Sequence, residues 1–68
     1  MLHIYHNKEE ILDMIKRSGE DGLSTETIAD RTGMSRRSAR YYTEQLNKQG
    51  LLFMKHKGWQ RFWVAKEI

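Results

Sequence analysis

Three arginines stand within five positions of one another in the middle of the chain: Arg36, Arg37 and Arg40. A guanidinium group can bind the edge of a guanine through two parallel hydrogen bonds, or a phosphate through a charge-assisted bond. The next acidic residue along the chain is Glu44, so no carboxylate stands beside the cluster in the sequence. The cluster therefore predicts a surface that binds a nucleic acid. The alternative that the sequence leaves open is an ordinary solvated helix surface.

The arginines lie at the start of a helix predicted over residues 36–49, where the helical period separates a buried side from an exposed one. The side expected to be buried carries Ala39, Tyr42, Leu46 and Gln49. The opposite side carries Arg37, Arg40, Tyr41, Glu44 and Lys48, with Arg36 at its flank. Ser35 is the expected N-cap and Gly50 the expected stop, because serine side chains cap helix starts and glycine favours helix ends.

A shorter helix is predicted over residues 25–32, directly before the arginine helix. Ser24 can cap its start, and Ile28 and Ala29 lie on one side of it. Gly33 ends it, because glycine takes a positive φ without penalty. Two helices joined by so tight a turn, with a small alanine where they cross, are typical of a helix-turn-helix. In that motif the second helix is the recognition helix, whose first turns face the DNA major groove.

An amphipathic helix is predicted near the start of the chain, over residues 7–18. Asn7 can cap it in a capping box with Glu10. Its apolar side chains recur at helical spacing: Ile11, Leu12, Met14 and Ile15. A cluster of turn-forming residues over 18–22 ends this helix.

After Gly50 the pattern changes from helix to strand. Residues 51–54 form a short apolar run, and residues 59–65 are rich in aromatic and β-branched side chains. The segment between them, Lys55-His56-Lys57-Gly58, predicts a turn centred on Lys57-Gly58, which makes the two runs a β-hairpin. Both faces of the second strand carry apolar residues, so the periodicity does not say which face is buried.

The order of the predicted elements indicates an α+β fold that is mostly helical, with three helices followed by a two-stranded β-hairpin. This is a winged helix-turn-helix, in which the hairpin is the wing. The chain has 68 residues and no segment with the composition of a linker. We therefore expect the whole chain, residues 1–68, to form a single DNA-binding domain.

The candidate DNA contacts come from two of these elements. On the recognition helix we expect Ser35, Arg36, Arg37, Arg40, Tyr41 and Glu44. A wing lies along the phosphate backbone or in the minor groove, where charge suffices. On the wing we expect Lys55, His56, Lys57 and Arg61. Two alternatives stay open: Tyr41 either touches the DNA backbone or covers the neighbouring surface, and the wing cations either bind phosphate or form a solvated turn.

Charge is divided unevenly between the two halves of the chain. Residues 1–34 carry 4 basic and 7 acidic side chains, a net charge of −3, whereas residues 35–68 carry 8 basic and 2 acidic side chains, a net charge of +6. A field of this kind favours a polyanionic partner, and double-stranded DNA is the one expected here.

Several other classes of protein are excluded or disfavoured. The chain has no cysteine, which rules out disulfides and thiolate zinc sites. No nucleophile with a base and an orienting group can be assembled, and His3 and His6 have no further ligands beside them, so we expect no enzyme, metal or other cofactor. The longest apolar runs have four residues, whereas a membrane helix needs about 20. With no signal peptide either, the expected location is the cytoplasm, at the nucleoid.

Much of the second half of the chain resembles a known family. The residues that carry the resemblance are Ile28-Ala29, Gly33-Met34-Ser35, Ala39-Arg40-Tyr41-Tyr42, Leu46, Lys48-Gln49-Gly50, Gly58 and Phe62-Trp63-Val64. They make the stretch over residues 24–66 similar to the PapI/FaeA-type regulators of fimbrial operons in enteric bacteria. The segment between Gly50 and Gly58 is shorter than expected for that family.

The resemblance implies a small transcriptional regulator that acts with the leucine-responsive regulatory protein. It implies binding at sites that overlap adenine-methylation sequences, and through them phase-variable expression of fimbriae. Transferred residue by residue, it supports Arg40 and the neighbouring Arg36 and Arg37 as the group that faces DNA.

The sequence offers two alternatives to DNA binding. A winged helix that docks on another regulator without reading DNA itself is the main alternative. RNA binding is disfavoured, because the aromatic side chains are expected in strand and core positions and not on an exposed stacking platform.

Overall fold

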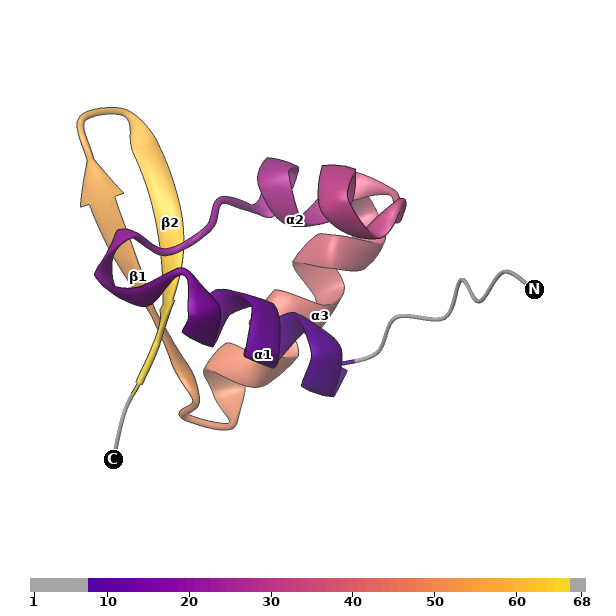
Figure 1. Ribbon diagram of the computed structural model, residues 1–68, viewed down its shortest axis with the longest axis horizontal. Helices are drawn as coiled ribbons and strands as arrows, with labels where there is room; N and C mark the ends of the chain where they lie inside the picture. Colours follow the sequence, from indigo (N-terminus) through magenta and orange to yellow (C-terminus); the bar gives the residue numbers. More distant parts are fainter. Residues whose placement is uncertain (1–7, 67–68) are drawn as a thin grey trace.

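The computed structural model describes residues 8–66, which form three helices followed by a hairpin (Figure 1). The elements are α1 (Lys8–Arg17), the 3₁₀ turn η1 (Gly19–Asp21), α2 (Thr25–Thr32), α3 (Arg36–Lys48), β1 (Leu52–Lys57) and β2 (Gln60–Ala65). The predicted fold class, α+β with the element order of a winged helix-turn-helix, is confirmed. The predicted cap Asn7 and the pair His3 and His6 lie outside the described residues.

Side chains at the ends of α2 and α3 hold the helix-turn-helix. Ser24 Oγ accepts a hydrogen bond from the Thr27 amide, and Ser35 Oγ accepts one from the Ser38 amide, both at 3.1 Å. Each serine therefore satisfies an amide that the first helical turn leaves unpaired, as predicted. Gly33 ends α2 in the left-handed conformation, with a φ of 76°, which confirms the predicted helix end.

The turn between α2 and α3 depends on Thr32, which the sequence pattern did not single out. Its side chain is buried, and its hydroxyl donates to the Ile28 carbonyl at 2.7 Å and accepts from the Met34 amide at 3.3 Å. One side chain therefore ties the last turn of α2 to the segment that leads into α3. These bonds help to fix the direction in which α3 leaves α2.

The buried side of α3 differs from the predicted stripe. Ala39 and Leu46 are buried as predicted, but Tyr42 is only partly buried and Gln49 is exposed. Thr43 is fully buried instead, and its hydroxyl donates to the carbonyl of the residue one turn earlier at 3.0 Å. A threonine can occupy this core position because its own helix satisfies the hydroxyl.

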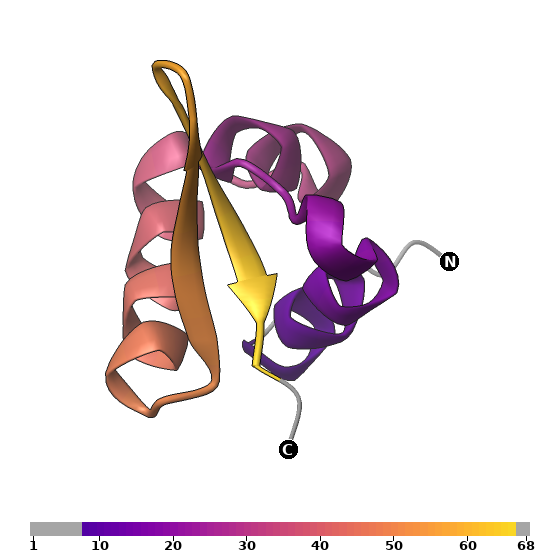
Figure 2. The ribbon, with the colours of Figure 1, turned by 90° about the vertical axis from the view of Figure 1, so that its left-hand side faces the viewer.

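The hydrophobic core of the described residues lies between the three helices and the inner half of the hairpin. Its buried members are Ile11, Ile15, Leu23, Ile28, Ala29, Ala39, Leu46, Leu52, Trp63 and Ala65. Figure 2 shows the hairpin standing between α3 on one side and α1 on the other. The inner end of β2 is therefore covered on both faces, and Trp63, Val64 and Ala65 are all buried although they are consecutive. This is why alternation could not predict a single buried face.

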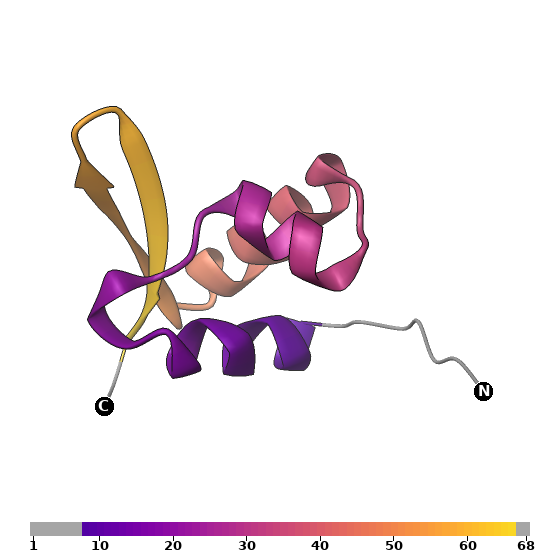
Figure 3. The same cartoon turned by 45° about the horizontal axis from the view of Figure 1, so that its top comes forward.

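The first strand of the hairpin runs further toward the tip than the sequence pattern predicted, whereas the second begins one residue later than predicted, at Gln60. The tip projects away from α1 (Figure 3). Residues 55–57 belong to β1 and not to the turn. The register pairs Lys57 with Gln60, which leaves Gly58 and Trp59 as a two-residue turn. Gly58 has a φ of 64° whereas Trp59 has no positive φ, as in a type II′ turn. The predicted turn centre is therefore wrong by one residue, because the strand pairing continues past the predicted end of the first strand.

A short bridge joins the hairpin to the segment before α2. The amides of Leu23 and Trp63 each donate to the other residue's carbonyl, at 3.0 and 2.8 Å. Gly22 runs so close to β2 that a Cβ there would lie 2.5 Å from the Trp63 carbonyl oxygen. The indole Nε1 of Trp63 also donates to Thr25 Oγ1 at 3.3 Å. Trp63 therefore anchors the wing to the start of α2.

Candidate nucleic-acid interface

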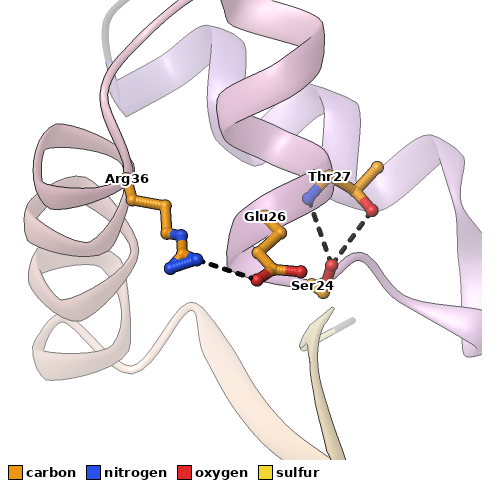
Figure 4. Close-up of polar contacts among 4 residues, drawn as sticks. All are labelled: Ser24, Glu26, Thr27 and Arg36. Carbon is orange, nitrogen blue, oxygen red and sulfur yellow. Dashed lines mark hydrogen bonds and ion pairs between the residues drawn. The ribbon is translucent and has the colours of Figure 1, made fainter.

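Arg36 is the first arginine of the predicted cluster and also the first residue of α3. Its Nη2 lies 3.1 Å from Oε2 of Glu26 on α2 (Figure 4), and its side chain is 66% exposed. An exposed pair of this kind contributes about 0–1 kcal/mol to stability. Its main consequence is geometric, since it holds the guanidinium near the N-terminal end of α2.

Arg40 pairs along its own helix, with its Nε 3.3 Å from Oε2 of Glu44 one turn later. In the sequence, no acidic residue follows the first arginine of the cluster before Glu44. In the fold, however, α2 brings the carboxylate of Glu26 to Arg36. Arg37 differs from both neighbours. Its side chain makes no hydrogen bond or ion pair with any other residue between 8 and 66.

Tyr41 follows the arginines on α3, and its side chain is 58% exposed. Its ring packs edge to face against the half-buried Tyr42, with 5.4 Å between the ring centroids and 72° between the ring planes. This contact supports one edge of the exposed ring. A contact between Tyr41 and DNA remains a prediction.

One groove of about 620 Å³ lies between α3 and the wing. Its lining residues are Thr25, Glu26, Arg36, Arg37, Arg40, Glu44, Met54, Arg61 and Trp63. The lining therefore holds more arginines than carboxylates around an apolar part formed by Met54 and Trp63. It brings Arg61 of β2 to the same surface as the arginines of α3, although these elements are far apart in the sequence.

The wing separates the four cationic candidates that the sequence predicted as one cluster around its tip. Residues paired across two strands share a face, and the register pairs His56 with Arg61, which lines the groove beside α3. Lys55 and Lys57 alternate with His56 and so lie on the other face. Lys55 Nζ donates to the carbonyl of Glu20 in η1 at 3.0 Å. The predicted cluster is therefore two pairs on opposite faces.

The expectation that the aromatic side chains are committed to strands and core is wrong for part of the chain. Trp59 is 97% exposed, and Phe53 on β1 is 43% exposed. The sequence pattern grouped Trp59 with the returning strand, because it follows the predicted turn glycine. The register explains the difference, since Trp59 is itself a turn residue and lies beyond the last pair of the ladder.

Comparison with known families provides a second line of evidence. The model of the family described as FaeA-like protein matches residues 7–66. The chain belongs to this family. A search of curated proteins found no match. The family match confirms the resemblance carried by the second half of the chain and extends it through the first helix.

The FaeA-like match includes every residue of the groove between α3 and the wing. It also includes α1 and the segment between Gly50 and Gly58. Within residues 8–66, no three or more side chains of the kinds that bind metals come together. In the same range no helix is long and apolar enough to span a membrane.

Proposed function

We propose that this FaeA-like protein is a sequence-specific DNA-binding regulator of transcription, acting on a fimbrial or similar surface-structure operon. The observation that supports the proposal is the groove in which Arg61 of the wing joins Arg36, Arg37 and Arg40 of α3. A recognition helix and a wing with cations on the same side can contact the base edges and phosphates of one duplex together. The proposal assigns the chain no enzymatic activity and no cofactor.

The three arginines of α3 have different roles in this proposal. Arg37 has no side-chain partner within the described part of the chain, so its guanidinium is available for a bidentate contact with guanine. Arg36 and Arg40 exchange weak surface ion pairs for stronger charge-assisted bonds to phosphate or base. Ser35 and the free amides of the first turn of α3 bind an adjacent phosphate. Glu44, once released by Arg40, can accept a hydrogen bond from cytosine.

The wing holds the duplex in register without reading much of its sequence. Arg61 binds a phosphate beside the recognition helix, and His56 supports it on the same face. Lys55 and Lys57 lie on the other face and contribute to the positive field of the wing. Contacts of this kind position a protein on DNA, whereas base contacts specify the site.

A second DNA-bound regulator completes the proposal. A single module of this size buries about 600–1,000 Å² of protein surface on DNA, which is small for a unique genomic site. Joint occupancy raises the apparent affinity by about 10²–10⁴-fold, because the bound partner raises the effective concentration. The leucine-responsive regulatory protein is the partner that the family resemblance implies.

Binding by the isolated chain should be weak and salt-sensitive, and should tighten when the partner is added to the same duplex. Tight, selective binding that the partner does not change would contradict this part of the proposal.

The Arg37→Ala variant tests whether α3 reads DNA. A duplex selected from a random pool is titrated with each protein at fixed salt. We expect the affinity for the selected site to fall about 10- to 100-fold with Arg37→Ala. The matched control is Arg17→Ala on α1, which removes an exposed arginine that pairs with Asp13 and does not line the groove. The control should bind within about twofold of the wild type.

Equal losses in Arg37→Ala and Arg17→Ala would reduce the effect to net charge and contradict reading by α3. Unchanged binding in both variants would also contradict it. If Arg37→Ala no longer binds a regulatory partner but binds DNA with unchanged affinity, the result would favour the alternative, a winged helix that docks on another regulator.

A further inference from the structure

The tip of the wing carries a residue that the proposed function does not use. Trp59 is 97% exposed, although tryptophan usually buries a large apolar area in a folded protein. Trp63 on the same hairpin is 6% exposed and donates a hydrogen bond to Thr25. The two indoles therefore have different roles: Trp63 anchors the wing, and Trp59 projects from it.

The fold does not require tryptophan at this position. The two-residue turn needs a positive φ at its first residue, and Gly58 supplies it. Trp59 occupies the second turn position without a positive φ, a conformation that most residues adopt. The strand ladder already closes at the pair of Lys57 and Gln60. The exposed indole therefore adds nothing to the core, and a substitution there leaves the hairpin intact.

At the tip of the wing, Trp59 borders a hollow that Arg61 also lines. This hollow of about 300 Å³ lies against the N-terminal end of α2, and Gln60 lines it too. Arg61 lines both this hollow and the groove that contains the arginines of α3. The surface therefore runs from the α3 cluster, over Arg61, to Trp59 at the tip. The tip also projects away from α1, so α1 leaves it open to a large partner (Figure 3).

We propose that Trp59 is a wedge whose indole inserts at a base step of the duplex bound by α3, entering from the minor groove and kinking the DNA. This inference rests on the proposed function. Trp59 lies two residues from Arg61 on the side of the tip, at most about 7 Å further along the hairpin, so the proposal places its indole beyond the phosphate that Arg61 binds. Gln60 beside it offers an amide to the minor-groove edges of the bases. Apolar side chains that enter the minor groove unstack base steps, and aromatic rings stack on the exposed bases.

The charges around Trp59 favour a duplex over a protein as the occupant. Lys57 precedes the turn and Arg61 follows it, and neither β1 nor β2 contains an acidic residue. Two phosphate backbones flank a minor groove, so cations on both strands of the wing suit it. The carboxylate that lines the hollow, Glu26, is paired with Arg36. An apolar protein pocket for tryptophan would need no such flanking cations.

The test compares the wild-type chain with Trp59→Ser and Trp59→Phe on one selected duplex that carries a fluorophore at each end. Bound wild type should shorten the distance between the duplex ends and quench the Trp59 emission, which is the difference between the wild-type and Trp59→Phe spectra. Trp59→Ser should bind about 10- to 100-fold more weakly and leave the duplex straight. Trp59→Phe should keep most of the affinity and the bend, because phenylalanine also inserts at base steps.

Phe53→Ser is the matched control, because Phe53 is an exposed aromatic residue on the opposite face of the wing. We expect it to change neither affinity nor bend. The emission of Trp63 in Trp59→Ser reports whether the wing is still folded.

A straight bound duplex, an unquenched Trp59 and equal affinity of Trp59→Ser would overturn the wedge and leave the proposed function standing. A defect of Trp59→Ser that appears only with a protein partner present would assign Trp59 to that partner and would also overturn the wedge. Failure of the wild type to bind any duplex would overturn the proposed function and the wedge with it.

Discussion

The recognition helix and the wing both present cations to one groove, but they arrange them differently. On α3, neighbouring arginines stay on one exposed side, and carboxylates hold Arg36 and Arg40. On the wing, sequence neighbours point to opposite faces, so Arg61 shares the side of α3 whereas Lys55 is directed to η1. The helical period gathers nearby charges and the strand period separates them. A charge cluster in a sequence is therefore a better guide to a surface on a helix than on a strand.

The two regions also differ in how they are fixed. Both ends of the turn between α2 and α3 are held by local hydrogen bonds, through Ser35 and Thr32. The wing is held at its base by the bridge between Leu23 and Trp63, and its tip projects beyond that anchor. We therefore expect substitutions at the joint, the contact of Gly22 and Leu23 with Trp63, to affect the stability of the whole domain. Substitutions of the cations should affect DNA binding alone.

The largest effect is expected at the joint, in Gly22→Ala. A Cβ at this position would meet the Trp63 carbonyl oxygen at 2.5 Å and Val64 Cγ2 at 2.9 Å, on a backbone with a φ of 73°. The free energy of unfolding should fall by about 3 kcal/mol, measured by urea denaturation. Gly19→Ala is the matched control, since its φ is 64° but nothing lies within 4 Å of its Cβ position. It should cost about 1 kcal/mol. Equal losses in the two variants would show that the joint does not couple the wing to the helices.

A smaller effect, on binding, is expected for Arg40→Ala on the recognition helix. The affinity for the selected duplex should fall by about 1–3 kcal/mol, with relaxed specificity at one base position. Glu44→Ala is the companion variant, because it frees Arg40 of its ion pair and also removes the acceptor proposed for cytosine. Its loss of affinity should be smaller than that of Arg40→Ala, because the freed guanidinium offsets part of the lost cytosine contact. Unchanged affinity of Arg40→Ala for its best site would remove Arg40 from the reading surface.

The smallest effect is expected for Arg61→Ala on the wing. Binding to all duplex sequences should weaken about equally, and the slope of log affinity against log salt should fall by about one unit, because one phosphate contact is lost. Lys55→Ala removes a cation from the other face and should leave that slope unchanged. A loss of affinity confined to one duplex sequence would instead show that the wing reads bases. Equal salt slopes for Arg61→Ala and Lys55→Ala would contradict the claim that only the face carrying Arg61 binds phosphate.

Features set by local rules were predictable from the sequence. The caps Ser24 and Ser35 and the stop at Gly33 each depend on a few consecutive residues, and all three are confirmed. The arginine side of α3 followed from the helical period alone. The end of the first wing strand was less predictable, because Gly58 fits either position of a two-residue turn until the register is known.

Features set by contacts between distant segments were not predictable. Glu26 reaches Arg36 only because α2 packs across the start of α3. Thr43 looks polar in the sequence, yet its own helix satisfies its hydroxyl and lets it enter the core. Trp59 and Trp63 are the same residue type on one hairpin, and only the three-dimensional register separates the exposed indole from the buried one.

The most direct test of the account is an amide NMR titration of the full chain with the selected duplex. The account predicts that the largest shifts fall in two segments far apart in the sequence, residues 35–44 of the recognition helix and residues 59–61 of the wing. The exposed face of α1, including Arg17, should show no shift beyond that seen with a non-specific duplex. Shifts centred on α1, or on the wing face that carries Lys55 and Lys57 with none on α3, would contradict the claim that α3 and Arg61 form one DNA-binding surface.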